Sequence, residues 1–261
     1  MEYADDLAST LELERLDRDL FRGVNTVMAK ERSSLFGGQV CAQALMAAGI
    51  TVAPDRLPHS LHGYFLRPGQ IDRPVLLHVD RDRDGKSFSA RHVAAVQDGE
   101  VIFSMLASFH GGAAESRFDD VGEAAAPAPE DCPAYRADRL LEIRQVSLTE
   151  VVEGRQLHSD SLWIRAAHPL SDDRLVQACA LAYLSDLGTG FGRVQLPGVG
   201  NGGPSIDHAL WFHEPIRADE WVLLQLWPWK ATPGRGLYRG ALRDRDHRLG
   251  ATVAQEHLLR D

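Results

Sequence analysis

An internal repeat divides this sequence into two similar halves. Gln39–Ala44 and Gln177–Ala182 share a glutamine, a cysteine and two alanines at a constant offset of 138 residues. Further along each half, Tyr64–Pro68 corresponds to Trp211–Pro215 at an offset of 147. Each match is short, but the two occur in the same order in both halves. Because a repeat is the signature of one structural unit made more than once, we predict two similar units in the chain.

A segment of different composition separates the two halves. Residues 111–135 are poor in large apolar side chains and rich in glycine, alanine and proline. Such a composition is typical of connecting chain. We therefore predict a first unit over residues 1–110, a linker over 111–135 and a second unit over 136–261.

Each half has the pattern of one helix followed by several strands. Residues 35–50 and 172–187 contain no proline and are apolar around most of their circumference, so a helix there must be covered on nearly every side. Alternating segments bounded by turn residues follow each helix and predict antiparallel strands. These strands are residues 60–66, 75–81, 87–97 and 101–110 in the first half and 209–212, 221–229, 236–243 and 249–258 in the second. A sheet wrapped around a buried helix, made twice, is an α+β fold.

The composition argues against several classes of function. The net charge is −9 and the 28 basic residues are interspersed with 37 acidic ones, so we expect no nucleic-acid partner. Neither the three cysteines nor the eleven histidines show metal-ligand spacing, so we expect no metal. The odd, widely spaced cysteines suit a reducing compartment. With an acidic N-terminus and no apolar run of roughly 18 residues, the chain is expected to be cytoplasmic and without a membrane span.

Seven segments, spread over almost the whole chain, form a recognisable pattern. They are residues 35–40 (LFGGQV), 59–69 (HSLHGYFLRPG), 84–91 (DGKSFSAR), 185–187 (SDL), 205–208 (SIDH), 211–213 (WFH) and 255–256 (QE). In content and order these segments resemble the acyl-CoA thioesterase II family. The resemblance implies a double hotdog, two tandem antiparallel sheets each wrapped around a central helix. It also implies hydrolysis of acyl-CoA to free fatty acid and coenzyme A, with no metal or other cofactor.

The resemblance further implies which residues act. The family's aspartate, threonine and glutamine, which together bind the attacking water, fall on Asp186, Ser205 and Gln255. Serine keeps the hydroxyl group but lacks the methyl group that restrains threonine's χ1. We expect the role to be preserved.

Asp186 can also be assessed from its position alone. Helical steps place it on the same stripe as Cys179 and Ala182, two small apolar residues. A carboxylate there either has a hydrogen-bonding partner at the end of the helix or serves as a general base that takes a proton from water.

Gln255 has a similar ambiguity. Alternation along its strand puts it on the face of Val253 and His257. An amide there can fix a water by donating and accepting at once, and it can equally be an ordinary edge-strand residue. The helix offset places Ala48 opposite Asp186, and strand register places Ala107 near the position of Gln255. We therefore predict one working site per chain, built on the second half.

Ser205 is not expected to be a nucleophile. Its neighbours Asp207 and His208 are adjacent in sequence, so along a strand they point to opposite faces. The chain also has no GxSxG motif, the turn that presents a catalytic serine in α/β-hydrolases.

Gly37 and Gly38 precede the first helix and are candidate substrate-binding residues. Backbone N–H groups at the positive end of a helix can polarise a thioester oxygen, and close packing explains glycine there equally well. Cys41 and Cys179 are expected to be packing residues on the two helices. We interpret the histidines, His208 among them, as core or surface residues.

Two other functions compete with hydrolysis. An enoyl-CoA hydratase on this fold is associated with a histidine five residues after the aspartate, where this sequence has Phe191. The second alternative is a catalytically silent acyl-CoA binder, because serine replaces the family's threonine. We also expect a homo-oligomer, because exposed sheets of this kind commonly pair.

Overall fold

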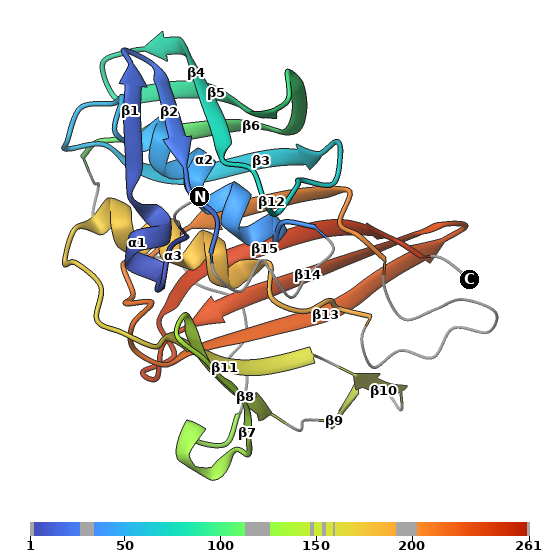
Figure 1. Ribbon diagram of the computed structural model, residues 1–261. Helices are drawn as coiled ribbons and strands as arrows, with labels where there is room; N and C mark the ends of the chain where they lie inside the picture. The colour runs from blue at the N-terminus through green and yellow to red at the C-terminus, as the bar shows by residue number, and fades with distance from the viewer. Residues whose placement is uncertain are drawn as a thin grey trace.

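Figure 1 shows the chain as a computed structural model. The structure describes residues 3–26, 34–112, 126–146, 149–152, 155–158, 160–191 and 203–259. Within these ranges, thirteen of fifteen strands form one antiparallel sheet, and two long helices lie side by side against it (Figure 1).

The sheet runs from first-half strands to second-half strands without interruption. In pairing order the first-half strands are β1 (Leu13–Asp17), β2 (Leu20–Gly23), β4 (Val75–Asp84), β5 (Phe88–Gln97), β6 (Glu100–His110) and β3 (Leu57–Phe65). The order continues with β12 (Asp207–Phe212), β15 (Leu249–Leu258), β14 (Arg235–Arg243), β13 (Val222–Thr232), β11 (Asp160–Ala166), β8 (Leu141–Val146) and β7 (Ala134–Ala137). A separate hairpin is formed by β9 (Thr149–Val152) and β10 (Arg155–His158).

The two predicted sheets are joined into one. Strands β3 and β12 pair antiparallel, with Leu61 opposite Leu210, and both leucines are fully buried. Each strand would otherwise be the open edge of its own half, with a row of unpaired backbone groups. Pairing the two edges satisfies these groups and joins the halves into one sheet.

The two predicted helices are confirmed with slightly shorter bounds. They are α2 (Gly37–Gly49) and α3 (Arg174–Ser185). Asp173 caps α3 by accepting a hydrogen bond from the N–H of Leu175 at 2.8 Å. The helices pack closely, since a Cβ added to Gly49 would lie 2.3 Å from Leu175 Cδ1. Buried residues from both helices and from both halves of the sheet form one continuous hydrophobic core.

The strand register confirms the internal repeat. His62 pairs with Leu106 between β3 and β6, and Ala209 pairs with Ala254 between β12 and β15. The offsets between these pairs, 147 and 148, agree with the offset read from the sequence. All eight predicted strands are present, with ends shifted by a few residues.

The prediction missed several elements that precede the long helix of each half. These are the short helix α1 (Leu7–Leu11) and the strands β1, β2, β7, β8, β9, β10 and β11. Most of the predicted linker, residues 113–125, lies outside the described residues. Its last part contains the 3-10 helix η2 (Pro129–Asp131) and the start of β7.

Candidate active site

Asp186 lies immediately after the last turn of α3. The helix ends at Ser185, and Asp186 is its C-cap residue with φ −95° and ψ 9°. Its side chain is only 7% exposed. The carboxylate points to the start of α2, because a Cβ added to Gly37 would lie 2.7 Å from Asp186 Oδ2. Asp186 also contributes, after the larger effect of burial, to raising the pKa of Cys41.

Gln255 connects Asp186 with Ser205. Its side chain is buried on β15, on the same face as Val253 and His257, as the alternation predicted. The amide Nε2 donates a 2.9 Å hydrogen bond to Asp186 Oδ1 and a second, short hydrogen bond to Ser205 Oγ. Segments that are far apart in the sequence thus bring the three predicted residues together.

Ser205 lies just before β12 and forms an isolated bridge with His257 of β15. Its neighbours take opposite directions, as the sequence indicated. Asp207 Oδ1 accepts a 2.7 Å hydrogen bond from the N–H of Glu256, whereas His208 is fully buried. His208 bonds to Ser185 and Gln255, so these neighbours do not form a serine–histidine–aspartate array with Ser205.

His208 is a functional candidate that the sequence interpretation missed. Its Nδ1 forms a short hydrogen bond with Gln255 Oε1, and its Nε2 lies 2.8 Å from Ser185 Oγ. The Gln255 amide can donate to Asp186 and Ser205 only while its oxygen, Oε1, points toward His208. Since Oε1 can only accept a hydrogen bond, Nδ1 of His208 must carry the proton and donate it. His208 therefore fixes the orientation of the Gln255 amide. Its burial could have been read from strand alternation, but its partner on β15 could not.

The two candidate glycines have different surroundings. Gly37 faces the Asp186 carboxylate and the ring of Phe65. At Gly38 an added Cβ would lie 2.6 Å from the carbonyl oxygen of Tyr183, which is backbone. The first hydrogen bonds of α2 come from the N–H groups of Gln39 and Val40, so those of Gly37 and Gly38 precede the helical pattern. Close packing explains Gly38, while Gly37 lies at the polar cluster.

A pocket opens beside this cluster, and we call it the Asp186 pocket. Its volume is about 480 Å³, within the range of small-molecule sites. Asp186, Ser205 and Gly37 line it together with apolar residues from α2, β3 and β6. The apolar lining residues include Leu35, Phe36, Val40, Phe65, Pro68, Ile102 and Phe103.

Two further findings bear on the nature of the site. Within the described ranges, no three histidine, cysteine or acidic side chains lie together in a way that could hold a metal ion. In the same part of the chain, no helix is both long enough and apolar enough to cross a bilayer.

Comparison with known proteins identifies the family. Residues 28–110 match the model of the acyl-CoA thioesterase N-terminal domain, and residues 133–258 match the acyl-CoA thioesterase model. The chain is 37% identical to acyl-coenzyme A thioesterase 8 of Mus musculus, in an alignment covering 97% of this chain and 88% of that protein. The chain belongs to the acyl-CoA thioesterase II family.

Solved structures agree with this assignment. An acyl-CoA thioesterase II of Mycobacterium marinum superposes with a TM-score of 0.85 at 38% identity, covering 97% of this chain and 96% of that one. A protein of Alicyclobacillus acidocaldarius described as a hot dog fold superposes with a TM-score of 0.79 at 20% identity, covering 98% of both chains. The chain therefore has a hotdog fold and is an acyl-CoA thioesterase.

Proposed function

We propose that Asp186, Ser205 and Gln255 together hold the water that attacks the thioester carbon of acyl-CoA. The observation that carries this proposal is the Gln255 amide, which donates to both other side chains from a buried position. Both of its N–H groups are used in this way, so it keeps Asp186 and Ser205 next to each other at the wall of the pocket. A water between the carboxylate and the hydroxyl can donate to the first and accept from the second.

In the proposed reaction Asp186 is the general base. It takes one proton from the water as the oxygen bonds to the thioester carbon, which gives a tetrahedral intermediate with a negative oxygen. The intermediate collapses with cleavage of the carbon–sulfur bond. The coenzyme A sulfur leaves with the electron pair and receives the proton held by Asp186, so the products are a fatty acid and the free thiol.

The backbone N–H of Gly37 is the proposed donor to the negative oxygen, and Gly38 is the second candidate. Both lie at the positive end of α2, where a developing negative charge is stabilised. The contact between Gly37 and the Asp186 carboxylate supports Gly37 as the first choice, because it brings the donor and the base to the same wall of the pocket. The apolar lining of the Asp186 pocket suits the acyl chain, and we propose medium- to long-chain acyl-CoA as substrate.

The test is release of coenzyme A, followed with a thiol reagent over a panel of acyl-CoAs in the presence of EDTA. We expect turnover in the wild type, a loss of roughly tenfold or more in Gln255→Ala, and near-normal turnover in Glu256→Ala. Glu256 is the matched control because it is the next residue on β15 and faces the other way. Equal turnover in the two variants would remove Gln255 from the mechanism, and hydration of enoyl-CoA without thiol release would favour the hydratase. Binding without either reaction would identify a silent binder.

We further propose that the two halves are two hotdog units, residues 1–110 and 136–261, connected by residues 111–135. The equivalent register of β3–β6 and β12–β15 supports this division. The shared core and the pairing of β3 with β12 suggest that neither unit folds alone. Expression of each half separately is expected to give insoluble or unfolded protein, and a cooperative unfolding transition in either half would contradict that expectation.

The outer face of the sheet supports a homo-oligomer. Three large side chains on its neighbouring central strands are exposed, Tyr64 by 57%, Leu106 by 52% and Trp211 by 38%. We propose that this face pairs with a second copy of the chain. Light scattering after gel filtration should give a multiple of 28.8 kDa, and Leu106→Asp should reduce it to the monomer mass.

The cytoplasm is the proposed location. All three cysteines are buried and free, which suits a compartment where disulfides do not form. Cell fractionation with an antibody against the chain tests this proposal.

A further inference from the structure

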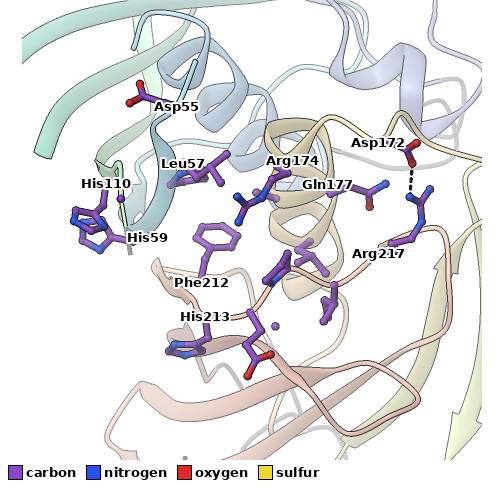
Figure 2. A pocket seen from close by; sticks show the side chains of 18 residues that line it. Asp55, Leu57, His59, His110, Asp172, Arg174, Gln177, Phe212, His213 and Arg217 are labelled. Atoms are coloured by element: carbon purple, nitrogen blue, oxygen red, sulfur yellow. Dashed lines mark hydrogen bonds and ion pairs between the residues drawn. The ribbon is translucent and has the colours of Figure 1, made fainter. Parts of the chain in front are cut away.

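A second pocket lies at the opposite end of the helix pair. Its volume, about 490 Å³, is close to the 480 Å³ of the Asp186 pocket. It is formed by the start of α3, the start of β3 and the end of β12 (Figure 2). We call it the Arg174 pocket. Its apolar lining residues include Leu57, Pro58, Leu181, Phe212 and Ile216.

The internal repeat relates the two pockets. Phe65 and Pro68 line the Asp186 pocket, and their equivalents at the offset of 147, Phe212 and Pro215, line the Arg174 pocket. The start of α2 contributes to one pocket, and the start of α3 contributes to the other. The Arg174 pocket is therefore the first half's copy of the site, and it retains the same surrounding elements, a helix start and the equivalent phenylalanine and proline.

The polar groups of the two pockets are different in kind. Ala48, Pro58 and Ala107 stand at the positions equivalent to Asp186, Ser205 and Gln255. None of these three side chains can hold or deprotonate a water. Conversely, one apolar residue of the Asp186 pocket has a charged equivalent, because Phe36 corresponds to Arg174 at the helix offset of 138. At these equivalent positions the copy has thus lost a carboxylate and gained a cation.

Arg174 is the cation available to a ligand in this pocket. Figure 2 shows its side chain reaching from α3 toward Leu57 and the ring of Phe212. Within the ranges that the structure describes, its guanidinium has no ion pair or hydrogen bond. The other arginine of the pocket, Arg217, is occupied by Asp219 at 2.8 Å and by Asp172 (Figure 2).

The remaining charged groups of the pocket do not neutralise Arg174. Figure 2 shows the Asp55 carboxylate directed away from it, and an added Cβ on Gly111 would lie 3.4 Å from Asp55 Oδ2. Glu214 lies near Arg248 and contributes, after the larger effects of Asp244 and Asp246, to raising the pKa of that guanidinium. Burial lowers the pKa of His59, so this histidine adds no positive charge at neutral pH.

We propose that the Arg174 pocket is a non-catalytic binding site for a fatty-acid carboxylate. A guanidinium is the side chain best suited to a carboxylate because it can donate two parallel hydrogen bonds. The apolar walls cover a hydrocarbon chain, whose removal from water favours binding. Fatty acid is the product of the reaction proposed above, and identifying it as this enzyme's own product rests on that proposed function. In the Asp186 pocket the same carboxylate would face Asp186, which repels it, and the arginine of that pocket, Arg67, is paired with Glu100.

Decanoate below its micellar concentration is a suitable probe, measured by calorimetry on the full chain. The experiment is repeated with the Asp186 pocket occupied by an S-decyl thioether of coenzyme A, which lacks the reactive carbonyl. We expect decanoate to bind in both cases at one per chain. Arg174→Gln should weaken this binding tenfold or more, while Arg18→Gln should not change it. Arg18 is the matched control because it is an arginine with an 80% exposed side chain outside the lining of the pocket.

Three results would overturn the proposal. They are unchanged decanoate affinity in Arg174→Gln, abolition of binding by the thioether, and equal affinity for decanol, which has the chain but no charge. Hydrolysis of acyl-CoA by Arg174→Gln is expected to stay within about twofold of the wild type, since the variant leaves the Asp186 pocket unaltered. The proposed function is tested separately by the Asp186 and Gln255 variants, so the failure of one proposal leaves the other standing.

Discussion

The two halves of this enzyme share a backbone plan and differ at the positions where chemistry is proposed. Gln255, hydrogen-bonded to His208, corresponds to Ala107, which lies opposite Leu61 in the first half. At other positions of the second-half site Asp186 corresponds to Ala48, Ser205 to Pro58 and His257 to Phe109. Each polar side chain has an apolar counterpart.

The difference shows how a duplicated fold can separate stability from activity. In the first half these positions complete an ordinary core, since Ala48, Leu61, Ala107 and Phe109 are all fully buried. In the second half the same positions hold buried polar groups, which are tolerated only when they are hydrogen-bonded. Asp186, Ser205, Gln255 and His208 meet this condition through one connected network, so these groups depend on one another. The buried Nε2 of His257 has no hydrogen-bond partner among the described residues.

The largest effect is expected at Asp186. Changing Asp186 to Ala should lower turnover by roughly a hundredfold or more, as for a lost general base, while binding of the thioether analogue remains measurable. The equivalent first-half change, Ala48→Ser, should leave turnover near normal. Turnover rates per folded molecule, measured for both variants, test whether Asp186 is the general base. Near-normal turnover in Asp186→Ala would mean that water is activated elsewhere, and the assignment of all three residues would be withdrawn.

His208→Leu is expected to have the next largest effect. Leucine is the residue of the first half at this position, Leu61, so the volume is conserved while the bond to Gln255 is lost. A free Gln255 amide can rotate, and we expect kcat to fall about tenfold, the value of one lost hydrogen bond of average strength. KM should change little, because His208 does not line the pocket. A rise in KM with unchanged kcat would show that His208 supports the shape of the pocket and does not orient the Gln255 amide.

Much of the fold could be predicted from local sequence, and the joining of the halves could not. Helical composition located α2 and α3 to within two residues at either end, because each must be covered on most sides. Pairing of β3 with β12 depends on two edges that are distant in sequence, and no local pattern records it. The five-residue helix α1 and four-residue strands such as β7 are too short to produce a clear periodicity.

The candidate site shows the same limit. Asp186, Ser205 and Gln255 were found through the family resemblance, since spacing alone left each of them with a structural explanation. Strand alternation indicated which face of β15 holds Gln255. The hydrogen bond from Gln255 to His208 joins residues 47 apart in sequence, so it required the register of two strands.

Two alanine substitutions at the start of α2 should separate binding from packing. In Gly37→Ala the new Cβ would press on the Asp186 carboxylate and Phe65, whose side chains can move, so we expect turnover to fall severalfold with little change in Tm. In Gly38→Ala it would press on the backbone carbonyl of Tyr183, which cannot move freely, and Tm should fall instead. The second half has Leu175 and Val176 at these positions. A drop in Tm without loss of turnover in Gly37→Ala would reduce both glycines to packing residues.

A buried histidine should make the second half sensitive to acid. Burial lowers the pKa of His257 from 6.5, so this group adds stability above pH 6.5. As the pH falls below 6.5 the unfolded chain takes up a proton that the folded chain does not, and stability decreases. His257→Phe copies the first-half residue Phe109 and should reduce the fall in Tm between pH 7.5 and 5.5. An identical pH dependence in the variant would assign the acid sensitivity to other groups.

The smallest effect on turnover is expected at the two cysteines that the repeat makes equivalent, where the two halves are most alike. Cys41 and Cys179 occupy equivalent helix positions and are fully buried. Burial, as the larger cause, raises the pKa of both thiols, so neither provides the thiolate that a covalent mechanism would need. The double variant Cys41→Ala, Cys179→Ala should therefore keep kcat per folded molecule within about twofold, although Cys41 lies close to Asp186.

The same substitutions should affect stability. Each lost sulfur leaves a small gap between α2 and α3, and urea unfolding should show that the free energy of unfolding decreases by about 1 kcal/mol for each. Because the two sites are related by the repeat, the single variants should lose similar amounts. Complete loss of turnover in a folded double variant would give a thiol a direct role, and would make the first half, through Cys41, a participant in the chemistry.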